Sequence, residues 1–129
     1  MPVLSQDKPV IVIKHMEPFG YPWLARQSRL QGSISIRLKI SSTGSVVDAE
    51  ASTADALLKE HPLLQNETVK QVRKWAFGCL NCASKDYYDH TLTFVYRLEG
   101  EETQKSKSHF TIDPPDRVTI TANPPQANW

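Results

Sequence analysis

The segment Ser33–Ser41 constrains the fold most strongly, because apolar and polar residues alternate along it without a break. The alternating set is Ser33, Ile34, Ser35, Ile36, Arg37, Leu38, Lys39 and Ile40. Successive side chains of a strand point to opposite faces, so this pattern predicts a strand with one face in the core and the other in water. Gly44 then tolerates the positive φ of a tight turn. Val46–Ser52 is therefore expected to return antiparallel and to complete a hairpin.

A second alternating segment, Thr91–Leu98, predicts another strand of the same kind. One face carries Leu92, Phe94, Tyr96 and Leu98, and the other carries Thr91, Thr93, Val95 and Arg97. Val10–Ile13 is a run of β-branched residues, which favours a strand that is either covered on both faces or added at an edge. His109–Ile112 and Arg117–Thr121 are each expected to form a short strand, one on each side of Pro114-Pro115.

Two helices are expected, and each begins at a proline, whose missing N–H costs nothing at the first helical position. The first runs from Pro22 to about Leu30, with Gly32 as its stop. The second, Pro62–Phe77, gathers one set of residues on a single side: Leu64, Thr68, Val69, Val72, Trp75 and Ala76. We interpret it as an amphipathic helix that lies on the sheet and ends at Gly78. Its two large aromatic residues are interpreted as core rather than as a binding surface.

Composition and charge narrow the function classes. The chain has 129 residues with 40% hydrophobic content, which suits one compact domain. No apolar run approaches the roughly 18 residues that cross a bilayer, and Met1–Lys8 lacks the apolar core of a signal peptide. The net charge is +1 with Lys and Arg dispersed along the chain, which argues against nucleic acid as a partner.

Cys79-x-x-Cys82 is the only motif with a chemical interpretation, and three explanations compete. A zinc site needs four ligands, and beside this one pair the chain has only scattered histidines, namely His15, His61, His90 and His109. A redox-active pair places its first cysteine at a helix N-terminus, where the dipole lowers the thiol pKa, whereas this pair follows the end of the predicted helix. We therefore expect a structural disulfide between Cys79 and Cys82, or two inert thiols in a turn, and no metal.

The other motifs give no support for catalysis, since neither G-x-S-x-G nor H-E-x-x-H occurs. His61 is interpreted as a helix-entry residue, and Asp113 and Asp116 as turn residues rather than an acid pair. Pro114-Pro115 and Pro124-Pro125 lack the PxxP spacing and are interpreted as loops. We expect no catalytic residue and no cofactor.

The structural signals follow one another in a specific order. They are Tyr21-Pro22 with Ala25, Gly32, Ile34 and Ile36, Gly44 and Val46, then Leu64, Val69, Val72 and Trp75-Ala76-Phe77. In this order and spacing, the stretch from Tyr21 to about Leu98 resembles the C-terminal domain of TonB, a periplasmic energy transducer. The resemblance implies an α+β fold, with an antiparallel sheet of three to five strands and helices packed on one face. Residues 1–20 would then form an N-terminal segment with one strand, residues 21–98 the TonB C-terminal-like domain, and residues 99–129 an extension with one or two short strands and a loose Pro-rich tail.

The resemblance also implies a non-catalytic protein-binding module. In that family the domain docks on outer-membrane transporters during energy-coupled transport, and a transporter segment adds itself as a strand beside the last strand of the sheet. Carried over to this chain, the partner-binding edge would be Thr91, Leu92, Thr93, Phe94, Val95, Tyr96, Arg97 and Leu98. The implied location is the periplasm of a Gram-negative bacterium, with a signal peptide or membrane anchor outside this chain.

Departures from the family pattern leave alternatives open. The anchor helix and the Pro-rich spacer of an energy transducer are absent from this sequence, and the connection Cys79–Asp89 is longer than the resemblance predicts. One alternative is a stand-alone periplasmic scaffold without a transport role, and a homodimer is compatible with either. The other alternative, from a different class, is a thiol–disulfide oxidoreductase that uses Cys79 and Cys82.

The tail that follows Glu99 bears on the function as well. Arg117–Thr121, or His109–Ile112 before it, is expected to return to the sheet and to pair with Thr91–Leu98 or with Val10–Ile13. Pairing with Thr91–Leu98 would block partner binding at that strand from within the same chain.

Overall fold

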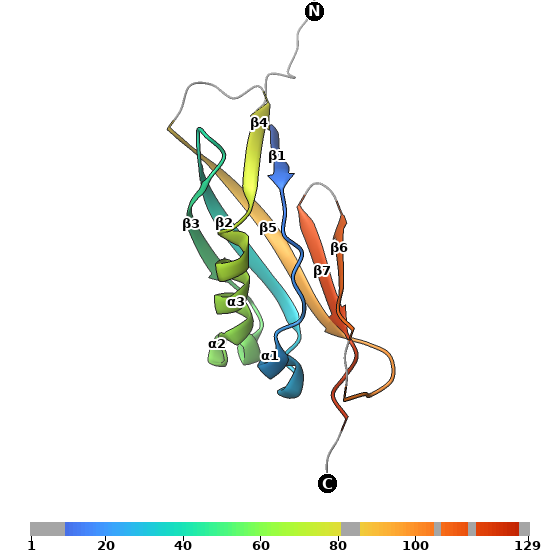
Figure 1. The fold of residues 1–129 in the computed structure, drawn as a ribbon. Helices are drawn as coiled ribbons and strands as arrows, with labels where there is room; N and C mark the ends of the chain where they lie inside the picture. The colour runs from blue at the N-terminus through green and yellow to red at the C-terminus, as the bar shows by residue number, and fades with distance from the viewer. Residues whose placement is uncertain (1–9, 81–85, 105–106, 114–115, 127–129) are drawn as a thin grey trace, which may run out of the picture.

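The computed structural model describes residues 10–80, 86–104, 107–113 and 116–126 (Figure 1). Their elements, in chain order, are β1 (Val10–His15), α1 (Trp23–Gln27), β2 (Gly32–Ser41), β3 (Val46–Ser52), α2 (Ala56–Glu60), α3 (Leu63–Val72), β4 (Ala76–Leu80), β5 (Tyr87–Leu98), β6 (His109–Asp113) and β7 (Arg117–Ala122). Within these ranges, no helix has both the length and the apolar character needed to cross a membrane.

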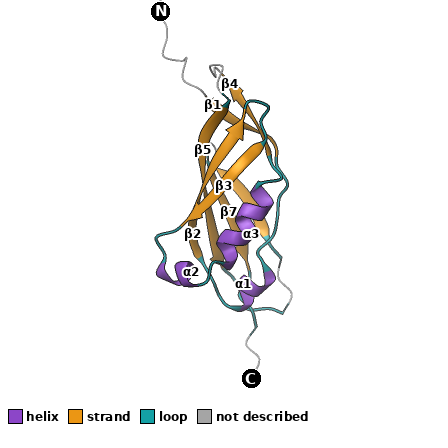
Figure 2. Cartoon of the chain, turned by 90° about the vertical axis from the view of Figure 1, so that its left-hand side faces the viewer, coloured by secondary structure: helices purple, strands orange, loops and turns teal. Residues whose placement is uncertain are grey.

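The strands form two sheets, and the larger one has the order β3-β2-β5-β7-β6. Its neighbours are antiparallel except β5 and β7, which run parallel. β1 and β4 form a separate antiparallel pair. Figure 2 shows the three helices gathered on one side of the molecule. The predicted α+β class is confirmed, although the large sheet is mixed rather than wholly antiparallel. The reason is topological. β6 forms the outer edge of the sheet, and β7 then returns antiparallel to β6 between β6 and β5, so that it runs parallel to β5.

The predicted hairpin is confirmed as β2 and β3, which pair from Ser35 with Ser52 to Ile40 with Val46. The inward residues of β2 are all buried, namely Ile34, Ile36, Leu38 and Ile40. Gly44 has a φ of +92°, and a Cβ at this position would stand 1.9 Å from the carbonyl oxygen of Phe77. The turn therefore requires glycine, both for its backbone conformation and because β4 passes directly beside it.

The second helix ends earlier than predicted. α3 spans Leu63–Val72, whereas Ala76–Leu80 is strand β4, paired with β1. The prediction of a helix to Phe77 is therefore wrong, because pairing with a strand more than 60 residues away in the sequence outweighs the local helical pattern. Gly78 is accordingly a strand residue, and a Cβ there would meet the side chain of Lys14 at 2.8 Å.

The other helices also differ from the prediction. α1 ends at Gln27, and Gly32 is the first residue of β2 rather than a helix stop. α2 was not predicted from the sequence pattern. Its N-cap is Asp55, whose carboxylate accepts hydrogen bonds from the backbone N–H groups of Leu57 and Leu58. A carboxylate cap of this kind is the local signal that identifies such a short helix.

The core lies between the large sheet and the layer formed by α1, α3 and the β1–β4 pair. Trp75 and Phe77 are both buried, which confirms their interpretation as core residues. The ring of Phe19 lies 6.5 Å from that of Trp75, 6.0 Å from that of Phe94 and 5.5 Å from that of Phe110. These aromatic contacts join the segment before α1, the connection between α3 and β4, strand β5 and strand β6 in one cluster.

Trp75→Ala should lower the free energy of unfolding by about 3–5 kcal/mol, because a fully buried aromatic ring is replaced by a cavity. The side chain of Trp75 is 2% exposed. Trp23→Ala is the matched control, since that side chain is 67% exposed, and its effect should stay within about 0.5 kcal/mol. Urea unfolding of both variants measures the difference. Equal effects of the two substitutions would contradict the core assignment.

Candidate protein-binding edge

Strand β5 is paired on one side along most of its length and on the other side only over its second half. β2 pairs with it from Tyr87 to Tyr96, and β7 pairs with its other side from Thr93 to Leu98. The prediction that Thr91–Leu98 forms an edge strand is therefore wrong for Thr93–Leu98. The alternation of a strand reveals its two faces but not its lateral neighbours, which is why the pattern could not show this. The expectation that the tail pairs with this strand is confirmed.

The β6–β7 hairpin is built into the core. Val118, Ile120 and Ala122 of β7 are buried. Phe110 of β6 lies 6.2 Å from the ring of Trp75, in the same aromatic cluster as Phe19. Detaching this hairpin from the sheet would expose its own apolar side chains and the ring of Trp75 to water, which is unfavourable. The hairpin is thus an integral part of the sheet.

Arg26 of α1 holds the segments that flank the hairpin. Its side chain is 3% exposed, and its Nε donates a hydrogen bond of 2.7 Å to the carbonyl oxygen of Asn123. Its Nη2 donates to the carbonyl oxygens of Pro124, at 3.1 Å, and of Thr103. A buried guanidinium is stable when several of its donors are satisfied in this way.

Arg29 adds a hydrogen bond of 3.0 Å to the carbonyl oxygen of Pro125. The prediction of a loose tail is therefore wrong for residues 123–125, and residues 127–129 lie outside the described ranges. No local pattern identified Arg26 or Arg29, because their partners are backbone carbonyls about 75 to 100 residues further along the chain.

The first half of β5, Tyr87–Leu92, has an open edge. Thr93 donates its backbone N–H to the carbonyl oxygen of Asp116 on the β7 side at 2.8 Å. Backbone groups alternate sides along a strand, so Tyr87, Asp89 and Thr91 direct their N–H and C=O groups to that same side. Among the described residues, no strand pairs with them there. Of the partner-binding edge predicted from the resemblance, only the beginning, Thr91–Leu92, is thus open. The open edge extends from there to Tyr87, outside the predicted range.

Carboxylates and basic residues both lie near this open edge, with Lys39 opposite Asp89 and Arg117 opposite Asp113 in the strand register. Asp86 directly precedes β5, Asp89 lies within it, and Asp113 and Asp116 flank the tip of the β6–β7 hairpin. All four side chains are exposed, and no ion pair involving them occurs among the described residues. Asp113 and Asp116 were predicted to be turn residues, and they do border a strand-to-strand connection.

The four histidines lie on different parts of the fold. His15 ends β1, 3.4 Å from Glu17, His61 separates α2 from α3, and His109 begins β6. His90 points to the inner face of β5, where its ring lies 6.3 Å from that of Phe77. The described residues contain no group of three or more His, Cys, Asp or Glu that could hold a metal ion.

Cys79 lies in β4 opposite Ile11 and is disulfide-bonded. Cys82 lies outside the described residues, so its pairing with Cys79 stays a prediction. The sequence argument placed Cys79 after a helix C-terminus, and this is wrong because the residue belongs to a strand.

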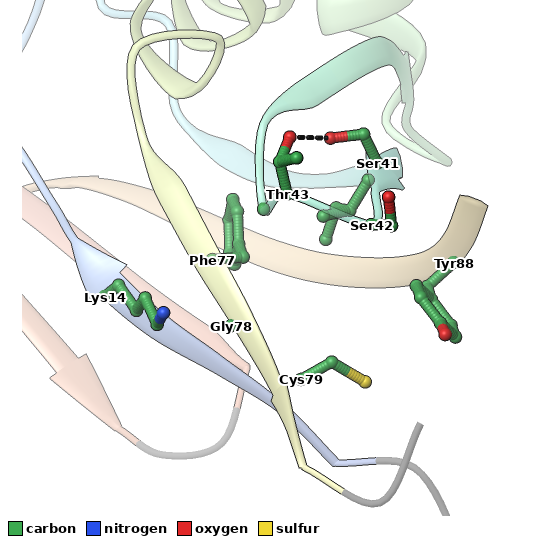
Figure 3. Close-up of a pocket in the computed structure, with 10 residues that line it drawn as sticks. Lys14, Ser41, Ser42, Thr43, Phe77, Gly78, Cys79 and Tyr88 are labelled. Carbon is green, nitrogen blue, oxygen red and sulfur yellow. Dashed lines mark hydrogen bonds between the residues drawn. The ribbon is translucent and has the colours of Figure 1, made fainter. Parts of the chain in front are cut away.

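A pocket of about 290 Å³ opens beside Cys79 (Figure 3). Lys14 reaches across Gly78 at one side of this pocket, and the Ser41–Gly44 turn forms the other side. The hydroxyls of Ser41 and Thr43 bond to each other at 2.8 Å, away from Cys79 in the view of Figure 3. These groups do not converge on a common point, so the pocket offers no nucleophile with an adjacent base.

The model of the family described as Gram-negative bacterial TonB protein C-terminal matches residues 17–98. The chain belongs to this family. No curated protein and no solved structure matches it. TonB C-terminal domains are periplasmic domains that interact with proteins in energy transduction. The match ends at the last residue of β5, so the hairpin that covers Thr93–Leu98 lies outside the residues that the family model matches.

Arg26→Met should lower the free energy of unfolding by about 2–3 kcal/mol, because several carbonyl groups lose a charged donor. Amide exchange in β7 should accelerate at the same time. Arg97→Met is the control: it removes the same charge from an exposed position and should change stability by less than about 0.5 kcal/mol. Chemical unfolding together with hydrogen exchange tests both effects. Unchanged β7 exchange in Arg26→Met would show that the hydrogen bonds of Arg26 do not hold the hairpin.

Burial lowers the pKa of His90, and the nearby Asp116 carboxylate acts in the opposite direction. The folded state therefore binds a proton at His90 less readily than the unfolded state does. Its contribution to stability is constant above the ordinary pKa of about 6.5 and falls as the pH drops below it. An NMR titration should place the midpoint below 6.5, and Asp116→Asn should lower it further. A midpoint raised by Asp116→Asn would contradict the placement of this carboxylate beside His90.

Proposed function

We propose that this TonB C-terminal domain is a non-catalytic protein-binding module that docks on outer-membrane transporters in the periplasm by strand addition to β5. The observation that carries the proposal is the open edge formed by Tyr87, Asp89 and Thr91. Unpaired N–H and C=O groups at the edge of a sheet are the recognition element of strand addition, since only an extended backbone satisfies them.

The family match supports the transport role, because members interact with proteins in energy transduction. The disulfide at Cys79 supports the location, because disulfides persist in oxidising compartments such as the bacterial periplasm.

A stand-alone periplasmic scaffold remains the second candidate. The observation that favours it is the β6–β7 hairpin, which occupies the side of Thr93–Leu98 where a partner strand would otherwise pair. A scaffold would use the fold for assembly without energy-coupled transport. The two candidates differ in whether peptides from transporters bind at the open edge.

Hydrogen exchange on the full chain tests the proposal. The probes are synthetic peptides that copy the periplasm-facing N-terminal segments of outer-membrane transporters. They should slow exchange of the N–H groups of Tyr87, Asp89 and Thr91, because these groups gain acceptors in the bound state. Protection confined to other elements, or none, would reject docking at this edge.

Thr91→Pro provides a structure-based control. Its N–H faces the open side, so proline removes a donor that the pairing with β2 does not use. The variant should keep its fold by circular dichroism and lose peptide binding at least tenfold. Ala51→Pro is the matched control, because the N–H of Ala51 faces the open side of the edge strand β3, and it should leave peptide binding unchanged.

A further inference from the structure

Strand β6 forms one outer edge of the large sheet (Figure 1). The carbonyl oxygens of Asp116 and Ala122 accept hydrogen bonds from the β5 side, so the even-numbered residues of β7 direct their backbone groups toward β5. Ile120 is one of these residues, and Phe110 lies opposite it in the β6–β7 register. The N–H and C=O groups of Phe110 therefore point away from β7, to the open side of β6.

Ile112 lies two residues further along β6 and directs its backbone groups to the same open side. Among the described residues, no strand pairs with β6 there, and no backbone hydrogen bond joins Phe110 or Ile112 to a further segment. Both side chains are half-buried and pack against the core from the inner face. The edge thus combines backbone groups that lack a neighbouring strand with apolar surface that a neighbour would cover.

The sequence of β6 is complementary to itself in the antiparallel direction. When two copies pair with Thr111 at the centre, Phe110 lies opposite Ile112 of the second copy. The outward-directed backbone groups of these two residues then meet, and each such pair exchanges two N–H···O=C hydrogen bonds. The aromatic–aliphatic pairs continue the inner face and the threonine pair lies on the outer face, and cross-strand pairs of both kinds stabilise a sheet.

The charges at the two ends of β6 match in the same register. His109 and Asp113 are exposed on the outer face, where Thr121 and Arg117 of β7 are their neighbours within the chain. On the open side, pairing places His109 opposite Asp113 of the second copy, and two-fold symmetry forms this contact twice. A neutral imidazole can donate an N–H to the carboxylate, and a protonated one adds the opposite charge, so both forms favour the contact.

The other edge of the large sheet lacks this complementarity. β3 carries Asp48 and Glu50 on its outer face. Antiparallel pairing of two β3 strands about Ala49 would place Asp48 opposite Glu50 of the second copy, and pairing about Glu50 would set that carboxylate against itself. Like charges directly opposite each other destabilise a sheet. Within the large sheet, the charges therefore favour self-pairing at β6 and oppose it at β3.

We propose that two copies of this chain associate through antiparallel pairing of their β6 strands, which joins the two large sheets into one. β6 lies outside residues 17–98, which the family model matches. β7 separates it from β5, so the dimer leaves the open edge Tyr87–Thr91 accessible in both copies. The inference goes beyond strand addition to β5 and does not depend on it.

Sedimentation velocity of the full chain, at protein concentrations from about 10 µM to about 1 mM, tests the association, because an interface built on one short strand gives a weak dimer. A monomer–dimer equilibrium is expected over this range. Hydrogen exchange at its two ends locates the interface. The N–H groups of Phe110 and Ile112 should exchange more slowly at the high concentration, because they gain acceptors in the dimer.

His109→Asp brings a second carboxylate opposite Asp113 and should raise the dissociation constant of the dimer about tenfold. Adding Asp113→Asn to this variant removes the repulsion and should return the constant to within about threefold of the original value. His61→Asp is the matched control: it makes the same change at an exposed position between α2 and α3 and should leave the association unchanged. Circular dichroism checks the fold of each variant.

The outcomes decide which edge is used. Protection of Phe110 and Ile112 at high concentration, with loss in His109→Asp and recovery in the double variant, supports pairing at β6. A monomer at every concentration overturns the proposal, and so does a dimer that protects β1 or Thr91 instead. Weakening by His109→Asp without recovery overturns the register. The transporter-derived peptides test strand addition to β5 separately, so either proposal can fail alone.

Discussion

The packing of Trp75 between the sheet and the segment before α1 is the interaction on which the rest of the structure depends. Its ring lies near those of Phe19, Phe94 and Phe110, which belong to three different parts of the chain. Because aromatic rings bury large areas, this cluster joins the family domain to its C-terminal extension in one core. The β6–β7 hairpin therefore shares the stability of the domain.

That shared core decides which surface remains for binding. β7 occupies the side of Thr93–Leu98, and Arg26 secures the chain before and after the hairpin. What stays open is the first half of β5, where backbone groups face a side without a neighbouring strand among the described residues. The hairpin beyond the matched residues thus covers one side of Thr93–Leu98 and leaves that side of Tyr87–Thr91 accessible.

The buried arginine illustrates how such an extension is held. A guanidinium in the interior needs acceptors for its donors, and here backbone carbonyls provide them. The same carbonyls, which belong to Asn123 and Pro124, gain charged donors in return. Each partner satisfies a group of the other, so the contact is specific even though it contains no carboxylate.

The sequence by itself determined the local features: the inward and outward residues of β2 and β5, the β2–β3 hairpin and the burial of Trp75 and Phe77. These follow from the two-residue period of a strand and from the hydrophobic effect, both of which can be read along a short segment. Only the tertiary structure decided that Ala76–Leu80 is a strand, that β7 runs parallel beside β5, and that Arg26 bonds to residues near 124. Those outcomes depend on pairing between distant segments, whose energy no local pattern contains.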